Sequence, residues 1–240
     1  MGASFAGQWM FAPVGLLPVV VFLLLLVYLD SYRMVRPRLV VATIAAGGVV
    51  AAVCYVVNGQ LMGLLGMDLP HYSRWVAPVV EESFKALIIV WLFRSNRVGF
   101  LVDSAILGFA VGAGFALVEN MYYLYLSNDT SLVIWLVRGC GTALMHGGVA
   151  AIFAVMAQTM SAHSMHIRLW HYLPGWVLAI SVHSIFNHFF VSPVASAIGT
   201  VLILPPILYV IFRISERRTH KWLEADFDED VDLIRIIDSG

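Results

Sequence analysis

Residues 75–93, WVAPVVEESFKALIIVWLF, place two adjacent carboxylates and a lysine in an otherwise apolar stretch: Glu81, Glu82 and Lys85. The stretch is long enough to cross the hydrocarbon core of a bilayer as an α-helix. A carboxylate at membrane depth costs roughly 2.5–3.5 kcal/mol on insertion scales, so its presence there is by default a sign of function. The stretch therefore predicts a membrane helix that carries part of a functional site.

The composition of the chain is that of a membrane protein. Of its 240 residues, 60% are hydrophobic and only 12% are charged, whereas a soluble domain carries about 25% charged residues. The net charge of −1 argues against nucleic-acid binding, because no basic stripe is available to neutralise phosphates. The two cysteines, Cys54 and Cys140, lie in apolar runs and are interpreted as small buried side chains. We therefore expect an all-α, polytopic membrane protein in a lipid bilayer.

Seven segments reach the length of about 20 residues that a membrane helix needs. They cover residues 11–29, 39–58, 75–93, 101–126, 134–160, 172–190 and 194–213. The first is interpreted as a retained helix, because residues 1–11 contain none of the basic residues that begin a signal peptide. We expect one transmembrane domain over residues 1–213 and an acidic cytosolic tail over residues 214–240.

The basic residues predict the orientation of the chain. Eleven of the 14 Lys and Arg residues fall in alternate connections or in the tail, and thus on one side of a seven-helix chain: Arg33, Arg36, Arg38, Arg94, Arg97, Arg168, Arg213, Arg217, Arg218, Lys221 and Arg235. Positive charge marks the cytoplasmic side. The pattern predicts a cell-membrane protein with its N-terminus outside and its C-terminus in the cytoplasm. Residues 59–74 then form an outer interfacial turn.

Further polar residues recur on the three segments after 75–93. With a rise of 1.5 Å per residue, Glu81, Glu119 and His183 each lie roughly 10 Å below the outer surface. His146 reaches the same depth if its helix effectively begins near Gly139, which would leave residues 132–138 at the interface. We therefore expect a polar site in the outer leaflet, within a four-helix core formed by the third to sixth helices.

Helical spacing indicates which of these residues face one another. Glu81 and Lys85 are four residues apart, so they can pair, while Glu82 points about 100° away from Glu81. One glutamate is expected to face the site and the other to support it. The same spacing puts His183 and Asn187 on one face, and Phe115 and Glu119 on another. Gly108 and Gly112 form a GxxxG pair that predicts close helix packing.

A buried carboxylate beside imidazoles suits the activation of water for attack on a carbonyl. The same Glu and His side chains suit Zn²⁺, so a metal-free and a zinc mechanism both remain open. The metal candidates are Glu81, Glu119, His146 and His183. The chain contains no HExxH motif and no GxSxG motif, which disfavours a zincin and a serine hydrolase.

Four motifs occur in order on successive segments. Residues 81–85 fit EExxK, residues 115–120 fit FxxxEN, a helix with His146 follows, and residues 183–187 fit HxxxN. Over residues 75–190 this order resembles the PrsW family of intramembrane proteases, which is related more distantly to CAAX prenyl endopeptidases and Abi proteins. The CAAX branch differs in having histidine where this chain has Glu119.

The resemblance implies hydrolysis of a peptide bond in a single-pass membrane protein, such as an anti-sigma factor cut on its outer side, in a bacterial cell. It implies that Glu81 is the base for water and Glu82 its partner. The site would be completed by Glu119, His146, His183 and Asn187, with Lys85, Phe115 and Asn120 in support. Two other functions remain open: a proton- or cation-coupled transporter, because Glu and His chains line such paths, and a non-catalytic membrane scaffold. The substrate and the oligomeric state are not predicted.

Overall fold

The computed structural model describes residues 9–30, 35–126, 131–161, 169–188 and 192–211, together with residues 213, 214 and 217. Nearly all of the predicted acidic tail lies outside these residues. The helices are α2 (Ala12–Tyr28), α3 (Pro37–Leu65), α4 (Leu69–Trp75), α5 (Ala77–Arg94), α6 (Leu101–Leu126), α7 (Leu132–Leu136), the π-helix η1 (Val137–Thr142), α8 (Ala143–Ser161), the 3₁₀-helix η2 (Leu169–Tyr172), α9 (Leu173–His188), and a last helix (Pro193–Ile211). Within the described ranges there is no strand. The prediction of an all-α fold is thus confirmed.

Four helices are long and apolar enough to cross a membrane: α3, α6, the continuous run Leu132–Met160 and the last helix. They correspond to four of the seven predicted spans. The helix α2 is apolar but has 17 residues, α5 has 18 residues with four charged side chains, and α9 has 16 residues. The chain is therefore a multi-pass membrane protein with shorter helices between its long ones.

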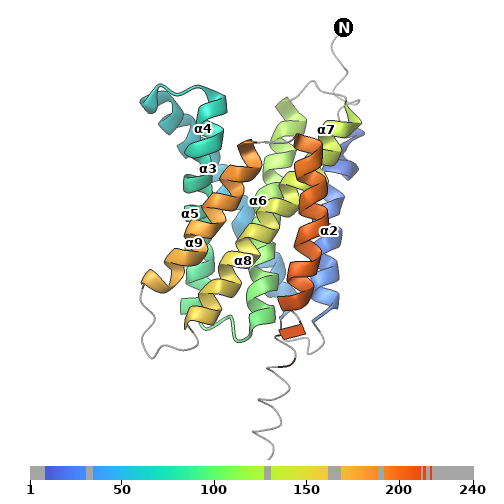
Figure 1. The fold of residues 1–240 in the computed structure, drawn as a ribbon, viewed down its shortest axis with the longest axis vertical. Helices are drawn as coiled ribbons and strands as arrows, with labels where there is room; N and C mark the ends of the chain where they lie inside the picture. The colour runs from blue at the N-terminus through green and yellow to red at the C-terminus, as the bar shows by residue number, and fades with distance from the viewer. Residues whose placement is uncertain are drawn as a thin grey trace, which may run out of the picture.

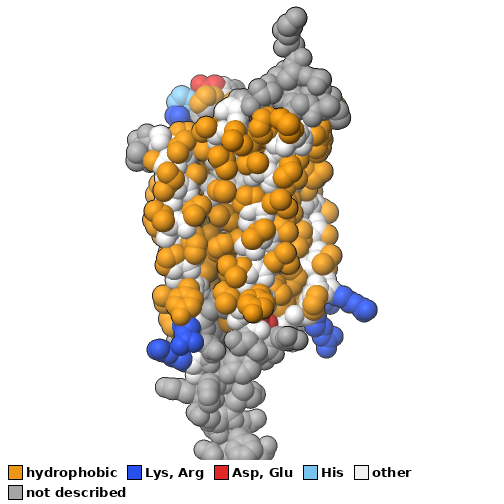
Figure 2. Space-filling view, turned by 90° about the vertical axis from the view of Figure 1, so that its right-hand side faces the viewer, with side chains coloured by type: hydrophobic (Ala, Val, Ile, Leu, Met, Phe, Trp, Pro, Cys, Tyr) orange, Lys and Arg blue, Asp and Glu red, His pale blue; other side chains and the backbone are white. Residues whose placement is uncertain are grey.

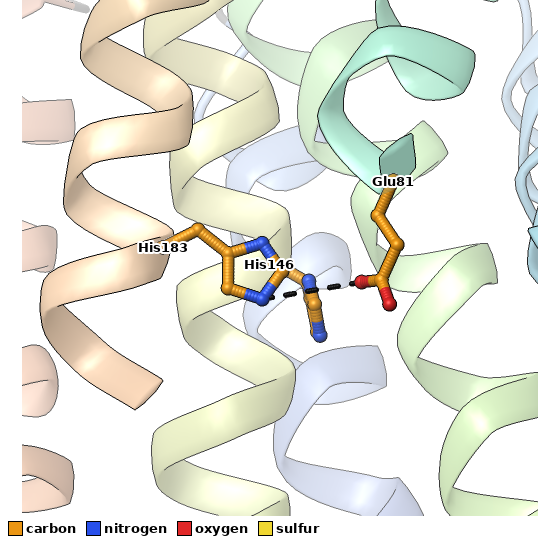
Figure 3. A group of neighbouring side chains, drawn as sticks. All are labelled: Glu81, His146 and His183. Atoms are coloured by element: carbon orange, nitrogen blue, oxygen red, sulfur yellow. Dashed lines mark ion pairs between the residues drawn. The ribbon is translucent and has the colours of Figure 1, made fainter. Parts of the chain in front are cut away.

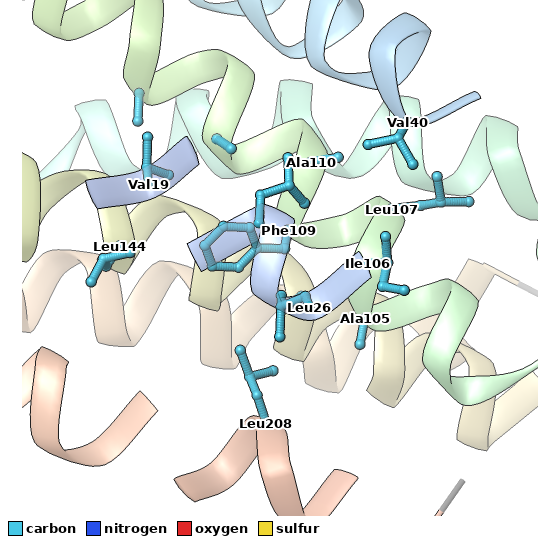
Figure 4. Packing of buried hydrophobic residues seen from close by; sticks show 14 of the residues in the cluster. Val19, Leu26, Val40, Ala105, Ile106, Leu107, Phe109, Ala110, Leu144 and Leu208 are labelled. Atoms are coloured by element: carbon cyan, nitrogen blue, oxygen red, sulfur yellow. The ribbon is translucent and has the colours of Figure 1, made fainter. Parts of the chain in front are cut away.

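The helices stand side by side as a bundle, with α6 near its centre (Figure 1). The helix α6 packs chiefly against α8 and α3 and also against α2. Its residues Ile106, Leu107 and Phe109 are fully or almost fully buried, and the surrounding helices contribute the side chains packed around them (Figure 4). The bundle core thus lies along α6, beside the helices that carry the polar residues.

The surface of the bundle is apolar along its length. Figure 2 shows hydrophobic side chains over most of the visible face, with Lys and Arg gathered at the lower end. Leu87 on α5 is 63% exposed and Leu202 on the last helix is 66% exposed. Such a continuous apolar surface fits contact with lipid rather than water. Arg36, before the first residue of α3, and Arg94, at the last residue of α5, are both exposed at ends of helices.

The predicted interfacial turn over residues 59–74 is mostly helical. The helix α3 continues to Leu65 and ends at Gly66, whose φ of 60° lies in the left-handed region that glycine adopts readily. The short helix α4 then begins after Asp68, whose side chain accepts a hydrogen bond from the backbone N–H of His71 at 2.9 Å. The helix α4 leads into α5 and packs against both α5 and α9.

Glycines allow α6 to approach its neighbours closely, as the GxxxG pair predicts. A Cβ atom at Gly112 would overlap the carbonyl oxygen of His146, and one at Gly114 would overlap that of Ile44. Gly112 therefore sets how near His146 lies to α6.

We expect Gly112→Ala to lower the stability of the protein by about 1–3 kcal/mol, the usual cost of inserting atoms into a packed interface. Thermal unfolding in one detergent should show a lower midpoint than for the wild type. Gly59→Ala is the matched control, because a Cβ there meets nothing within 4 Å. Equal midpoints for the two variants would contradict the packing role of Gly112.

Candidate metal centre and its surroundings

Three ionisable side chains from three helices converge in the bundle. Glu81 on α5, His146 on α8 and His183 on α9 each offer a ligand atom, and these atoms lie within 4.8 Å of one another. Glu81 Oε2 is 3.9 Å from His183 Nε2, and Figure 3 shows the carboxylate pointing toward the two rings. The two imidazoles meet edge to face, with their centroids 4.7 Å apart. Three of the four predicted metal candidates therefore form one cluster.

Glu82 lies behind this cluster and fixes the orientation of one ring. Its Oε1 atom is 2.7 Å from His183 Nδ1 and accepts a hydrogen bond from Lys85 Nζ at 2.8 Å. A carboxylate only accepts, so His183 Nδ1 carries a proton, and in the neutral ring Nε2 is then the acceptor. Nε2 faces the Glu81 carboxyl group. A carboxylate that holds the far nitrogen of a metal-binding histidine is the usual support of such a ligand.

Lys85 pairs with Glu82 rather than with Glu81, so the predicted Glu81–Lys85 pair is wrong. The two partners are three residues apart and both side chains are buried, at 1% and 2% exposure. They share the face of α5 turned into the bundle, whereas the Glu81 side chain is 12% exposed. Glu81 therefore faces the cluster, while Glu82 lies behind it and is paired with Lys85.

Lys85 also reaches His146. Its Nζ atom lies 2.8 Å from His146 Nδ1 and 4.0 Å from the centroid of the Phe115 ring. An ammonium group only donates, so Nδ1 accepts, and in the neutral ring Nε2 then carries the proton and is turned toward other partners. Phe115 also packs against the His146 ring, with centroids 4.9 Å apart. Lys85 and Phe115, which were predicted as supporting residues, thus both contact His146.

Glu119 borders the cluster. Its Oε2 atom is 3.3 Å from His146 Nε2 and 3.5 Å from a terminal nitrogen of Arg138. The Glu119 side chain is 25% exposed, more than any of the other carboxylates of the site. The open side of the site therefore lies at Glu119 and Glu81, and the closed side at Glu82 and Lys85.

Arg138 is a site residue that the sequence analysis placed at the membrane interface. It belongs to the π-helix η1, where one extra residue per turn changes the direction of the following side chains. Its Nε atom donates to Asn120 Oδ1 at 3.0 Å, and its guanidinium lies 3.5 Å from the Tyr123 ring centroid. Trp135, also expected at the interface, is fully buried. The available signal was an arginine at membrane depth near a glutamate on a neighbouring helix.

The two asparagines of the motifs bind backbone rather than the cluster. Asn120 donates to the carbonyl of Gly15 on α2 at 2.8 Å. Asn187 donates to the carbonyl of Ser73 on α4 at 2.9 Å, and Ser184 donates to the carbonyl of Arg74 at 2.6 Å. Asn187 therefore attaches α4 to the C-terminal end of α9, one turn beyond the histidine that faces the cluster.

Two further contacts, both made by Asn58, were not predicted from the sequence. Asn58 on α3 donates from Nδ2 to Glu81 Oε1 at 3.2 Å. The hydroxyl of Tyr72 on α4 donates to Asn58 Oδ1 at 2.9 Å. Neither residue stands out in the sequence, because Asn58 is the last residue of a predicted span and Tyr72 falls in the predicted turn.

The cysteines do not contribute to this site. Cys54 and Cys140 are both unpaired as thiols, and neither belongs to the cluster of possible metal ligands. The donor set is thus one carboxylate and two imidazoles, which is a set that Zn²⁺ favours.

The comparisons with known proteins agree with this donor set. The model of the PrsW family intramembrane metalloproteases matches residues 36–213, which is most of the chain and includes every residue of the cluster. A search of curated proteins found no match. A search of solved structures also found none.

Proposed function

This chain belongs to the PrsW family of intramembrane metalloproteases, and we propose that it hydrolyses a peptide bond of a membrane-anchored protein at the Glu81–His146–His183 cluster. The convergence of these three ligand atoms within 4.8 Å is the observation that carries the proposal. Membrane proteolysis follows from the family. We propose that the residues of the cluster carry it out.

The donor set fits a divalent metal ion. In its neutral form, with the proton on Nδ1, His183 presents Nε2 as an acceptor toward the Glu81 carboxyl group, with 3.9 Å between Nε2 and Oε2. A cation between these two atoms would have both as ligands, and His146 would supply the third through Nε2 once metal binding has displaced the proton of that nitrogen. When bound, such an ion supplies positive charge that polarises a carbonyl and acidifies water.

The remaining residues divide into orienting groups and groups on the open side. Glu82 and Lys85 hold the far nitrogens of His183 and His146, which keeps both rings turned toward the cluster. A carboxylate engaged as a ligand is no longer free to take a proton. Glu119, which lies 3.3 Å from His146 Nε2 and is the most exposed carboxylate of the site, is then the base for water.

Arg138 supports a transition state at this open side. Its terminal nitrogen stays 3.5 Å from Glu119, so a positive charge is already in place where the oxygen of a tetrahedral intermediate would develop negative charge. Asn187, which the family resemblance places in the site, instead donates from its amide to the carbonyl of Ser73. We therefore assign charge stabilisation to Arg138.

The setting of the reaction follows from the depth of the site. We propose seven membrane spans, an outer N-terminus and a cytoplasmic tail, with the cluster roughly 10 Å below the outer surface. A single-pass protein could present its outer juxtamembrane segment there. An anti-sigma factor cut at a first, outer site in a bacterium is the specific candidate substrate.

Metal removal tests the proposal. The purified protein in lipid nanodiscs, with a single-pass reporter substrate, should lose cleavage on treatment with 1,10-phenanthroline. One of Zn²⁺, Mn²⁺ or Co²⁺ should restore cleavage, with about one metal per chain expected for a single three-ligand site. His146→Ala and His183→Ala should lose both metal and activity, and His171→Ala, in η2 before the first residue of α9, should lose neither.

Other outcomes would redirect the assignment. Undiminished cleavage in a metal-depleted protein would return Glu81 to the role of a metal-free base. Cleavage that persists in His146→Ala and His183→Ala would overturn the site. Substrate-driven proton flux without cleavage would indicate a transporter, and a requirement for the protein in a partner's activity despite both His variants would indicate a scaffold.

A further inference from the structure

Glu81 receives a hydrogen bond from outside the helices that form the cluster. The ligand atoms come from α5, α8 and α9, whereas Asn58 lies on α3 and Tyr72 on α4. Asn58 Nδ2 donates to Glu81 Oε1 at 3.2 Å, and Tyr72 donates to Asn58 Oδ1 at 2.9 Å. Tyr72 is only 2% exposed. The buried Tyr72 is thus linked through the Asn58 amide to Glu81, which is the most exposed of the three proposed ligands.

The chemistry of this chain of contacts permits one orientation of the amide. A carboxylate accepts hydrogen bonds only, so the NH₂ group of Asn58 must face Glu81. The carbonyl group of the same amide then faces Tyr72, whose hydroxyl can donate to it. The reverse orientation would set the amide oxygen against the carboxylate oxygen. The Glu81 carboxylate therefore determines the orientation of the Asn58 amide, and the Tyr72 hydroxyl donates to the amide oxygen and holds it in place.

As a result, the two carboxylate oxygens of Glu81 have different partners. Oε1 is occupied by Asn58, while Oε2 faces His183 Nε2 at 3.9 Å. The Glu81 side chain is 12% exposed, so without this bond its terminal torsion, which is broad for glutamate, could turn either oxygen to the open side. Partners of this kind around a metal ligand usually affect metal affinity or activity by about 10–100-fold.

We infer that Asn58 and Tyr72 are positioning residues that hold Glu81 Oε2 toward His183 and the metal. The inference rests on the proposed function, in which Glu81 is a ligand. It also gives a role to α4. Asn187 and Ser184 on α9 bind the α4 backbone at Ser73 and Arg74, next to Tyr72, so α9 secures the helix that orients the ligand from α5.

The test measures metal affinity and the kinetic constants separately. For Asn58→Ala we expect zinc affinity to fall about 10–100-fold in competition with a chromogenic chelator. We expect kcat for the reporter substrate to fall as well, with KM unchanged, because neither residue touches the substrate. Tyr72→Phe keeps the ring and loses only the hydroxyl, and should lower zinc affinity about 5-fold, the value of one ordinary hydrogen bond.

Controls separate positioning from folding and from failure of the proposed function. Tyr55→Phe is the matched control, because Tyr55 lies one turn before Asn58 on α3 and is 57% exposed; it should bind zinc as the wild type does. If Asn58→Ala fails to fold, Tyr72→Phe decides. Wild-type zinc affinity in folded Asn58→Ala and Tyr72→Phe, with affinity lost in Glu81→Ala, would overturn this inference alone. Zinc binding retained in Glu81→Ala would overturn the proposed site itself.

Discussion

Replacing Glu81 with glutamine is expected to reduce cleavage of a membrane-anchored substrate by at least roughly 10²–10⁴-fold, the contribution of a positioned acid–base group. The substitution keeps the size of the side chain but removes the negative charge that the His183 lone pair faces at 3.9 Å. A neutral amide binds a divalent cation far more weakly than a carboxylate, so the loss should be larger still if Glu81 is a metal ligand. Cleavage would be measured by mass spectrometry of the products formed in nanodiscs.

The matched control for this variant is Glu224→Gln in the acidic C-terminal stretch. Both variants exchange one glutamate for glutamine, and Glu81 belongs to the cluster. Thermal unfolding should be similar for the two proteins, since the Glu81 side chain is partly exposed. A Glu81→Gln protein that cleaves at the wild-type rate would refute the role of Glu81 under either a metal or a metal-free mechanism.

Lys85→Met is expected to destabilise the protein by about 3–5 kcal/mol, because removal of one partner leaves a buried charge uncompensated. Glu82 is 2% exposed at its side chain, and Lys85 is its only cationic partner of fixed charge among the described residues. Methionine retains the apolar stem over Phe115. The free energy of unfolding would be measured by denaturant titration in mixed micelles.

A second substitution should recover much of this loss. In Lys85→Met/Glu82→Gln the buried charge is gone, while the glutamine amide can still accept from His183 Nδ1. We expect the double variant to be more stable than Lys85→Met alone, and to remain impaired in cleavage. Arg94→Met is the control on the same helix, because its side chain is exposed and its loss should change stability by less than about 0.5 kcal/mol. Equal destabilisation of Arg94→Met and Lys85→Met would contradict the buried pair.

The sequence located the functional helices because apolar length and polar residues are both visible in it. Depth along a helix follows from counting residues, and this brought Glu81, Glu119, His146 and His183 into one predicted layer. In the structure Glu81, His146 and His183 form one cluster, with Glu81 3.9 Å from His183, and Glu119 lies 3.3 Å from His146. Helical rise is nearly constant, so axial position is predictable.

Direction around each helix could not be read with the same certainty. The Glu81–Lys85 spacing of four residues was a valid pairing, but Glu82 at three residues was equally available, and packing against α8 and α9 selected it. The π-helix η1 changes the direction in which the Arg138 side chain points, and the sequence contains no pattern that predicts a π-helix there. Asn58 and Tyr72 act through contacts between α3, α4 and α5, which depend on how the helices pack in three dimensions.

The distribution of the three ligand atoms over α5, α8 and α9 has a consequence for the biogenesis of the enzyme. A ribosome synthesises these helices in order, and His183 on α9 emerges about a hundred residues after Glu81. A nascent chain halted before α9 would hold two of the three ligand atoms and would also lack the Asn187 contact that secures α4. If these three residues form the active site, as we propose, peptidase activity would begin only after the bundle is nearly complete.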